Sequence, residues 1–149
     1  MSPKNPSASL TPWAPLPLRL IVGFGFMQHG WAKLHHGPDA FAAILHALAV
    51  PAPYLMAWLT IATELLGGAL VLAGAFLPLI SIPMAIVMIT AMLTVHLRYG
   101  FSSIKLLGVT AAGPRFGPPG YECDLLYLAC IAALVMLGPG PFSLGNRRR

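Results

Sequence analysis

The sequence predicts an all-α protein, a polytopic membrane four-helix bundle with a short interfacial helix between its first and second spans. Hydrophobic residues make up 57% of the 149-residue chain and charged residues only 9%, whereas a soluble domain carries roughly 25% charged residues to face water. Four segments approach the roughly 20 residues that a spanning helix needs. The formal charge of +5 comes from basic residues at segment ends and in the last residues, which is typical of membrane-flanking charges. They form no basic stripe for nucleic acid.

The four predicted spans cover residues 16–34, 53–76, 77–97 and 121–137. The first is the least apolar, the second is interrupted by one acid, and the third has no formal charge. The fourth is short and is stopped by Pro139 and Pro141. Residues 38–48 place apolar side chains at helical spacing, but this segment is too short to span, so we expect an interfacial helix there.

This pattern divides the chain into a disordered N-terminal tail (1–15), a four-span membrane domain (16–141) and a basic C-terminal tail (142–149). The connection 99–120 is rich in Gly and Pro, and we expect a structureless loop that is functional or covers something. Four spans place both termini on one side. The basic residues divide five against four between the two sides, and the terminal triple arginine favours cytoplasmic termini in a bacterial inner membrane.

Glu64 is the most informative residue, because it lies near the middle of the second span. A charged side chain at the bilayer centre costs at least about 2.5–3.5 kcal/mol, so Glu64 must face the bundle interior, find a partner or stay protonated. Gly67 and Gly68 follow on the same helix face, and Gly23 and Gly30 offer a matching face on the first span. Small residues of this kind let two helices approach closely.

Other polar residues lie at similar depth on the same side of the midplane. With 1.5 Å per residue, His29 falls about 4–5 Å from the midplane, and Lys33, His96 and Glu122 fall about 10–12 Å from it. We therefore predict a polar half-bundle above Glu64. Arg19 lies on the other side, and we expect its long side chain to snorkel to the headgroups there.

The sequence contains no metal-ligand spacing and no haem, flavin or iron–sulfur motif. Cys123 and Cys130 lie about 10 Å apart along a helix, which is too far for a disulfide, and we expect both to be packing residues. Glu64 also has a purely structural interpretation, in which a buried Glu–Lys or Glu–His pair fixes helix packing and has no other role.

Residues 25–34, with the sequence GFMQHGWAKL, resemble the first-span signature of the DoxX family of small four-span bacterial membrane proteins. The segments ELLGGAL from Glu64, GYE ending at Glu122, and GPG from Gly138 fit the order and spacing of that family, as does His96 near the end of the third span. The resemblance covers roughly residues 17–145. One departure is that the family often continues after the GPG to an Asp, whereas this chain has Gly145 and Asn146 there.

The resemblance implies a membrane subunit of a redox complex, similar to thiosulfate:quinone oxidoreductase. A quinone pocket suits the residues: Glu64, His29 and Lys33 as catalytic groups, with His96, Glu122, Gly67 and Gly68 as substrate-binding residues. Electrons would come from a soluble redox partner. Two other functions stay open, a non-catalytic membrane scaffold that recruits soluble redox or stress proteins through residues 99–120, and a small transporter or proton pathway. The sequence leaves open whether the protein is an enzyme at all.

Overall fold

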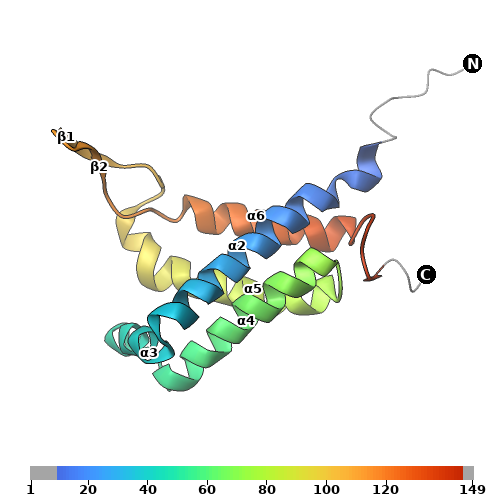
Figure 1. Cartoon of the computed structure of the whole chain (residues 1–149), viewed down its shortest axis with the longest axis horizontal. Coiled ribbons are helices and arrows are strands. Elements are labelled where there is room, and N and C mark those ends of the chain that lie inside the picture. The colour runs from blue at the N-terminus through green and yellow to red at the C-terminus, as the bar shows by residue number, and fades with distance from the viewer. Residues whose placement is uncertain (1–9, 146–149) are drawn as a thin grey trace, which may run out of the picture.

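The computed structural model describes residues 10–145, and residues 1–9 and 146–149 of the two predicted tails lie outside that range. The long α-helices are α2 (Pro15–His36), α4 (Pro53–Ala73), α5 (Leu77–Ala91) and α6 (Glu122–Leu137). A 3-10 turn, η1 (Thr11–Trp13), precedes α2, and α5 is extended by a π-helical turn, η2 (Met92–His96), and a 3-10 turn, η3 (Leu97–Tyr99). Figure 1 shows that α2 begins and α6 ends at one end of the molecule.

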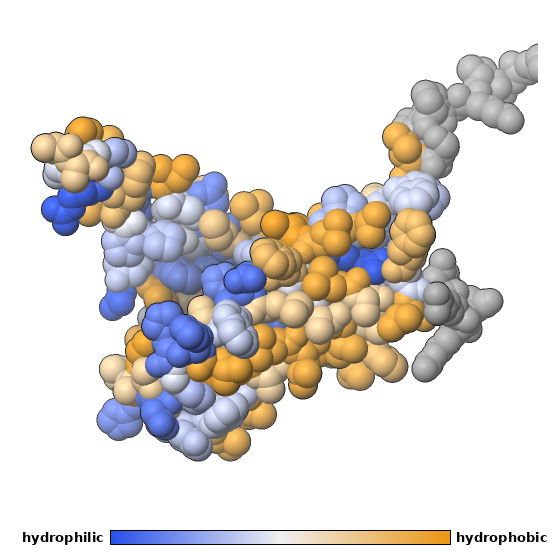
Figure 2. Space-filling view, viewed as in Figure 1, coloured by the Kyte–Doolittle hydropathy of each residue, from blue (hydrophilic) through white to orange (hydrophobic). Residues whose placement is uncertain are grey.

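Two stretches among residues 10–145 are long and apolar enough to cross a membrane. These are Pro53–Ala73, with 21 residues, and Leu77–Tyr99, with 23 residues. Only 17% of the second stretch is buried inside the protein. Many large apolar side chains therefore point outward, and Figure 2 shows them as a broad hydrophobic surface over the bundle. A surface of this kind suits hydrocarbon better than water.

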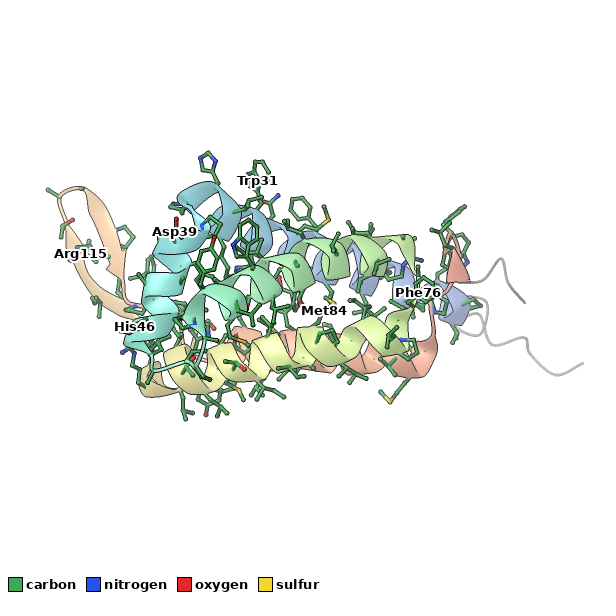
Figure 3. All side chains as sticks on the ribbon, turned by 90° about the horizontal axis from the view of Figure 1, so that it is seen from below. Trp31, Asp39, His46, Phe76, Met84 and Arg115 are labelled. Atoms are coloured by element: carbon green, nitrogen blue, oxygen red, sulfur yellow. The ribbon has the colours of Figure 1, made fainter. Side chains whose placement is uncertain are left out.

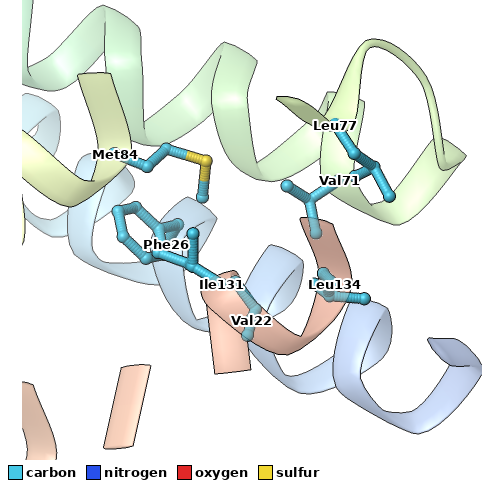
Figure 4. Close-up of a cluster of buried hydrophobic side chains, with 7 residues drawn as sticks. All are labelled: Val22, Phe26, Val71, Leu77, Met84, Ile131 and Leu134. Atoms are coloured by element: carbon cyan, nitrogen blue, oxygen red, sulfur yellow. The ribbon is translucent and has the colours of Figure 1, made fainter. Parts of the chain in front are cut away.

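The core of the bundle comes from all four long helices. Met84 of α5 is fully buried, and Figure 3 shows it inside the bundle, between Phe76 at one end and Arg115 at the other. The buried cluster around it is drawn in Figure 4 and consists of Val22, Phe26, Val71, Leu77, Met84, Ile131 and Leu134. These contacts fix the relative positions of α2, α4, α5 and α6.

The predicted small-residue face between the first two long helices is confirmed. A Cβ atom added to Gly23 of α2 would lie 2.7 Å from the backbone oxygen of Gly68, and one added to Gly68 would lie 2.6 Å from that of Gly23. Glycine at both positions thus lets the backbones of α2 and α4 touch. Gly67 faces α5 instead, where an added Cβ would meet the Met84 side chain at 3.1 Å.

The short helix expected between the first two spans is present as α3 (Pro38–Ala47). Proline stands in its first turn, where a missing N–H is tolerated. Ala42 and Leu45 of α3 are buried against Ala57 of α4. The helix therefore caps the end of the bundle at which α2 finishes.

The expectation of a structureless loop over residues 99–120 is wrong. Two antiparallel strands, β1 (Leu106–Thr110) and β2 (Gly113–Phe116), form a hairpin there, so the chain is not purely helical. Gly113 provides the positive φ of the tight turn, and the Thr110 hydroxyl donates a hydrogen bond to its carbonyl. Pro114 lies within β2, which is possible because every strand of a two-stranded ribbon is an edge strand, where proline is tolerated.

Arg19 does not snorkel toward headgroups, which corrects the expectation from the sequence. Its side chain is 2% exposed. Its guanidinium donates hydrogen bonds to five backbone carbonyls, two at the end of α4 and three in the segment after α6, namely those of Val71, Leu72, Pro139, Pro141 and Phe142. The Leu144 and Gly145 amides also bond to Ala73 and Gly74. The chain after α6 is thereby fixed to the bundle.

Candidate functional site

The ion pair between Lys33 and Glu64 lies at the centre of the candidate site. The Lys33 ammonium donates to both carboxylate oxygens of Glu64, at 2.8 and 2.7 Å. The Glu64 side chain is 3% exposed and that of Lys33 is 23% exposed. The predicted inward orientation of Glu64 and its proximity to Lys33 are both present in the structure.

Local helix geometry explains why this pair forms. Gly30 lies one helical turn before Lys33 on α2, and a Cβ added there would come within 3.0 Å of the Glu64 Cβ. The absence of a side chain at Gly30 leaves space for Glu64 against α2. Residues three apart lie on the same helix face, so Lys33 reaches the carboxylate from the next turn. Phe41 of α3 covers the ammonium, with its ring centre 5.3 Å from Nζ.

A second pair lies at the same end of the bundle, between His96 and Asp124. The His96 Nδ1 atom lies 2.7 Å from a carboxylate oxygen of Asp124, whose side chain is 5% exposed. His96 ends the π-helical turn η2, and a π-helical turn rotates the following side chains relative to a regular α-helix. Such turns are frequent at functional sites.

Asp124 was missed as a site residue because it stands in the first turn of the last helix, where an acid is usually a helix-terminal or boundary residue. The one available signal was its spacing: it lies two residues after Glu122, so the two acids point to different sides of α6. The carboxylate on the buried side is that of Asp124, and the Glu122 side chain is half-buried.

His29 lies between the two pairs. Its imidazole is within electrostatic range of Lys33, Asp124 and His96. Its ring packs edge-on to Tyr127 of α6, with 6.5 Å between ring centres. His29 is exposed at the helix surface, so this ring joins the buried pairs to the outside of the bundle.

Tyr127 is another residue that the sequence analysis did not single out. Its hydroxyl lies over Gly25 of α2, so closely that an added Cβ would collide with it. Its ring also packs edge-on to Phe26, at 5.6 Å between centres. Tyr127 therefore brings α6 against the α2 face that carries His29.

The remaining predicted site residues lie apart from the Lys33–Glu64 pair. The Glu122 carboxylate accepts a hydrogen bond from the Ser103 amide at 2.9 Å, which fixes the base of the hairpin. Gly67 and Gly68 are buried in the contacts of α4 with α5 and α2. Within residues 10–145, no three His, Cys, Asp or Glu side chains gather as a metal site would require.

The fold and the site define a class: a mainly helical membrane protein with two ion pairs at one end of its bundle. The sequence model of the DoxX family matches residues 14–97, more than half of the chain. The chain therefore belongs to the DoxX family. No curated protein and no solved structure matches it.

Proposed function

We propose that the chain crosses the bacterial inner membrane four times, with α2, α4, α5 and α6 as its spans and both termini in the cytoplasm. The charges on α2 do not oppose this, because Arg19 is covered by backbone carbonyls and Lys33 by Glu64. α6 has 16 residues, about 24 Å at 1.5 Å per residue, and is shorter than α5 with its extensions, which together cover the 23 residues Leu77–Tyr99. Its exposed side chains, such as Leu126 and Met136, are apolar and suited to lipid.

This topology is tested by the labelling of cysteines with a membrane-impermeant thiol reagent. In a C123S/C130A background, spheroplasts should expose Gly108→Cys on the hairpin and protect Leu144→Cys at the other end. Labelling of Leu144→Cys alone would reverse the orientation. Labelling of both in intact spheroplasts would place residues 108 and 144 on the same side and would contradict α6 as a span between them.

The proposed function is that of a quinone-interacting membrane subunit of a redox complex, and the Lys33–Glu64 pair is the observation that carries it. An intramembrane acid with a cation is a functional site by default. The donor set fits a quinone: the Lys33 ammonium is partly accessible and the His29 imidazole is exposed, both on an apolar helix surface. A bound quinone would supply two-electron, two-proton redox chemistry.

In this proposal, some residues of the chain would bind the quinone and others would supply its protons. The Lys33 ammonium and the His29 imidazole are hydrogen-bond donors that would polarise a carbonyl oxygen. The Glu64 carboxyl can hold a proton and release it beside that oxygen. His96 is 28% exposed and contacts the buried Asp124, so this second pair offers a path for protons from the aqueous side. Electrons come from a soluble partner, because the sequence carries no redox-cofactor motif.

The quinone site is tested by binding and by turnover. Trp31 lies two residues before Lys33, so a short-chain benzoquinone bound there should quench its fluorescence in detergent-purified protein. Glu64→Gln and Lys33→Gln should each weaken saturable quenching at least tenfold, and Glu64→Gln should abolish quinone-dependent turnover of the complex. Asp39→Asn, which changes an exposed acid of α3 near the same end, is the matched control.

Equal quenching by all three variants would exclude this site. Mass spectrometry of the protein purified in mild detergent gives an independent readout, since a co-purified quinone supports the proposal. A stoichiometric soluble protein without any quinone would favour the scaffold function instead. The projecting hairpin supports that second candidate, and its deletion would then abolish partner recovery while Glu64→Gln would leave it intact.

A further inference from the structure

The hairpin carries an apolar face that no part of residues 10–145 covers. Val109 pairs with Pro114, and Leu106 pairs with Phe116. Directly paired residues share a face of the ribbon, and residues two apart on one strand share it as well. The four side chains therefore lie together. Leu106, Val109 and Phe116 are 59%, 75% and 59% exposed.

A β-bulge places Leu106 on this face. The register shifts between Leu106 and Gly108, so that Leu107 has no partner of its own. With strict alternation, Leu106 would lie on the same face as Gly108, opposite to Val109. The extra residue reverses this and brings Leu106 to the side of Val109 and Phe116. The unpaired Leu107 lies against Gly117. The other face holds Gly108, Thr110, Gly113 and Arg115.

The surroundings of the hairpin are basic and apolar. Between residues 98 and 121 the charged residues are Arg98, Lys105 and Arg115, with no acid. Arg98 and Lys105 both lie over the Tyr99 ring, at 4.8 and 5.6 Å from its centre. Phe101 and Ile104 at the base are also exposed and continue the apolar surface. Figure 1 shows the hairpin at the end of the bundle where α5 is extended and α6 begins.

We infer that the hairpin lies in the headgroup layer of the membrane, with the face of Leu106, Val109, Pro114 and Phe116 inserted at the acyl boundary and its cations on anionic phosphates. The three positive charges outnumber the one acid at the base of the hairpin, Glu122, and they complement an anionic lipid surface. A tyrosine beneath two cations is typical of the interface.

A protein partner fits this surface less well. A stable protein interface uses about 20–30 residues on each side, whereas this face has four large side chains on two strands of five and four residues. Insertion at the lipid boundary requires no minimum area, because each apolar side chain contributes separately. An isolated two-stranded hairpin is also marginally stable in water, and burial of its apolar face stabilises it.

Two neighbouring positions on opposite faces allow a direct test. Val109→Cys and Gly108→Cys are introduced singly into full-length C123S/C130A protein, and each is labelled with a nitroxide. The label at Gly108 is tolerated because an added Cβ would meet nothing within 4 Å. The proteins are placed in nanodiscs of phosphatidylcholine with or without phosphatidylglycerol. The collision rates with oxygen, which concentrates in lipid, and with a water-soluble nickel chelate are then measured.

In phosphatidylglycerol nanodiscs, the oxygen-to-nickel ratio at Val109→Cys should be severalfold higher than at Gly108→Cys. The ratio should fall when Lys105→Gln and Arg115→Gln are added, or when phosphatidylglycerol is omitted. Equal and water-like ratios at the two positions would overturn the inference. A Val109 label protected from both reagents would also overturn it, because a second copy or another protein would then cover the face. A nitroxide at Leu79→Cys, exposed on α5, controls for an intact bundle.

Discussion

The two ends of the bundle each bury a cation, but they neutralise it differently. At the end near α3, the Lys33 ammonium is paired with the Glu64 carboxylate. At the end near η1, the Arg19 guanidinium is surrounded by five backbone carbonyls, and no acid of residues 10–145 forms an ion pair with it. Both groups lie on α2, about four turns apart.

This difference means that the Lys33–Glu64 pair can take part in chemistry, whereas the Arg19 cluster only stabilises the structure. A carboxylate can take up or release a proton, so the Lys33–Glu64 pair can change its charge during chemistry. Backbone carbonyls cannot titrate, and guanidinium stays charged in proteins. The cluster of Arg19 and its five acceptors is therefore fixed at every pH, and its role is to hold the segment after α6 against α4. Substitution of Arg19 and substitution of Lys33 should therefore have different consequences.

Arg19→Gln should give the largest loss of stability. The Val71 carbonyl still accepts a hydrogen bond from the Gly74 amide, so four partly buried carbonyls lose their donor. Each buried acceptor left without a donor costs about 1–3 kcal/mol, so the loss should be on the order of 4 kcal/mol. The thermal unfolding midpoint in detergent, followed by tryptophan fluorescence, measures it. Arg98→Gln is the control, since Arg98 is exposed and stacks on Tyr99.

The same variant should also release the segment after α6. A protease added to the folded protein should cut near Phe142 in Arg19→Gln and spare the parent protein. An Arg19→Gln protein as stable and as resistant as Arg98→Gln would show that the carbonyl cluster contributes nothing, and the comparison of the two ends would fail.

Single substitutions in the Lys33–Glu64 ion pair should give the second-largest loss of stability. Glu64→Leu leaves the Lys33 ammonium without its anion, and Lys33→Met leaves the buried Glu64 carboxylate without its cation. Removal of one partner of a buried pair costs about 3 kcal/mol or more. The double variant Lys33→Met/Glu64→Leu removes both charges, so it should recover most of that stability. Unfolding midpoints of the four proteins form a double-mutant cycle. Additive effects of the two substitutions would mean that the pair has no coupling energy in the membrane protein.

The sequence predicts one end of the bundle much better than the other. Glu64, Lys33 and the glycines at helical spacing could be placed on facing helices because helix periodicity fixes which side chains share a face. The acceptors of Arg19 could not be found in this way. They are backbone atoms that carry no side-chain signal, and they lie more than 50 and more than 120 residues away from Arg19 along the chain.

The hairpin and Asp124 were missed for related reasons. Gly and Pro over residues 113–120 indicated a break in regular structure, but two-stranded ribbons tolerate both residues. The position of the bulge depends on the strand register, which a single sequence does not fix. The contact of Asp124 with His96 depends on the π-helical turn η2, whose extra residue per turn has no signature in the sequence.

The stability of the contact between α2 and α4 should depend more on Gly68 than on the neighbouring Gly67. Gly68→Ala places a Cβ against the backbone of Gly23, which cannot move without separating α2 from α4. Overpacking of this kind costs typically about 1–3 kcal/mol. Gly67→Ala meets side chains and no backbone, those of Met84 at 3.1 Å and Ile80 at 3.3 Å, and should cost less. Unfolding midpoints compare the two, and a larger effect at Gly67 would contradict the backbone contact of α2 with α4.

His96→Gln should give the smallest of these effects on stability. His96 and Asp124 are 28% and 5% exposed, much like Lys33 and Glu64 at 23% and 3%, but a glutamine amide can still donate to Asp124. The loss should therefore be about 1 kcal/mol, as for a single hydrogen bond. His46→Gln, at an exposed histidine of α3, is the matched control. Because the substitution keeps a donor beside the carboxylate, His96→Gln must cost less than Glu64→Leu. If it costs more, the His96–Asp124 pair, and not the Lys33–Glu64 pair, is the main electrostatic contact at this end. The proton path proposed through His96 also predicts that His96→Gln lowers quinone-dependent turnover although the protein stays folded.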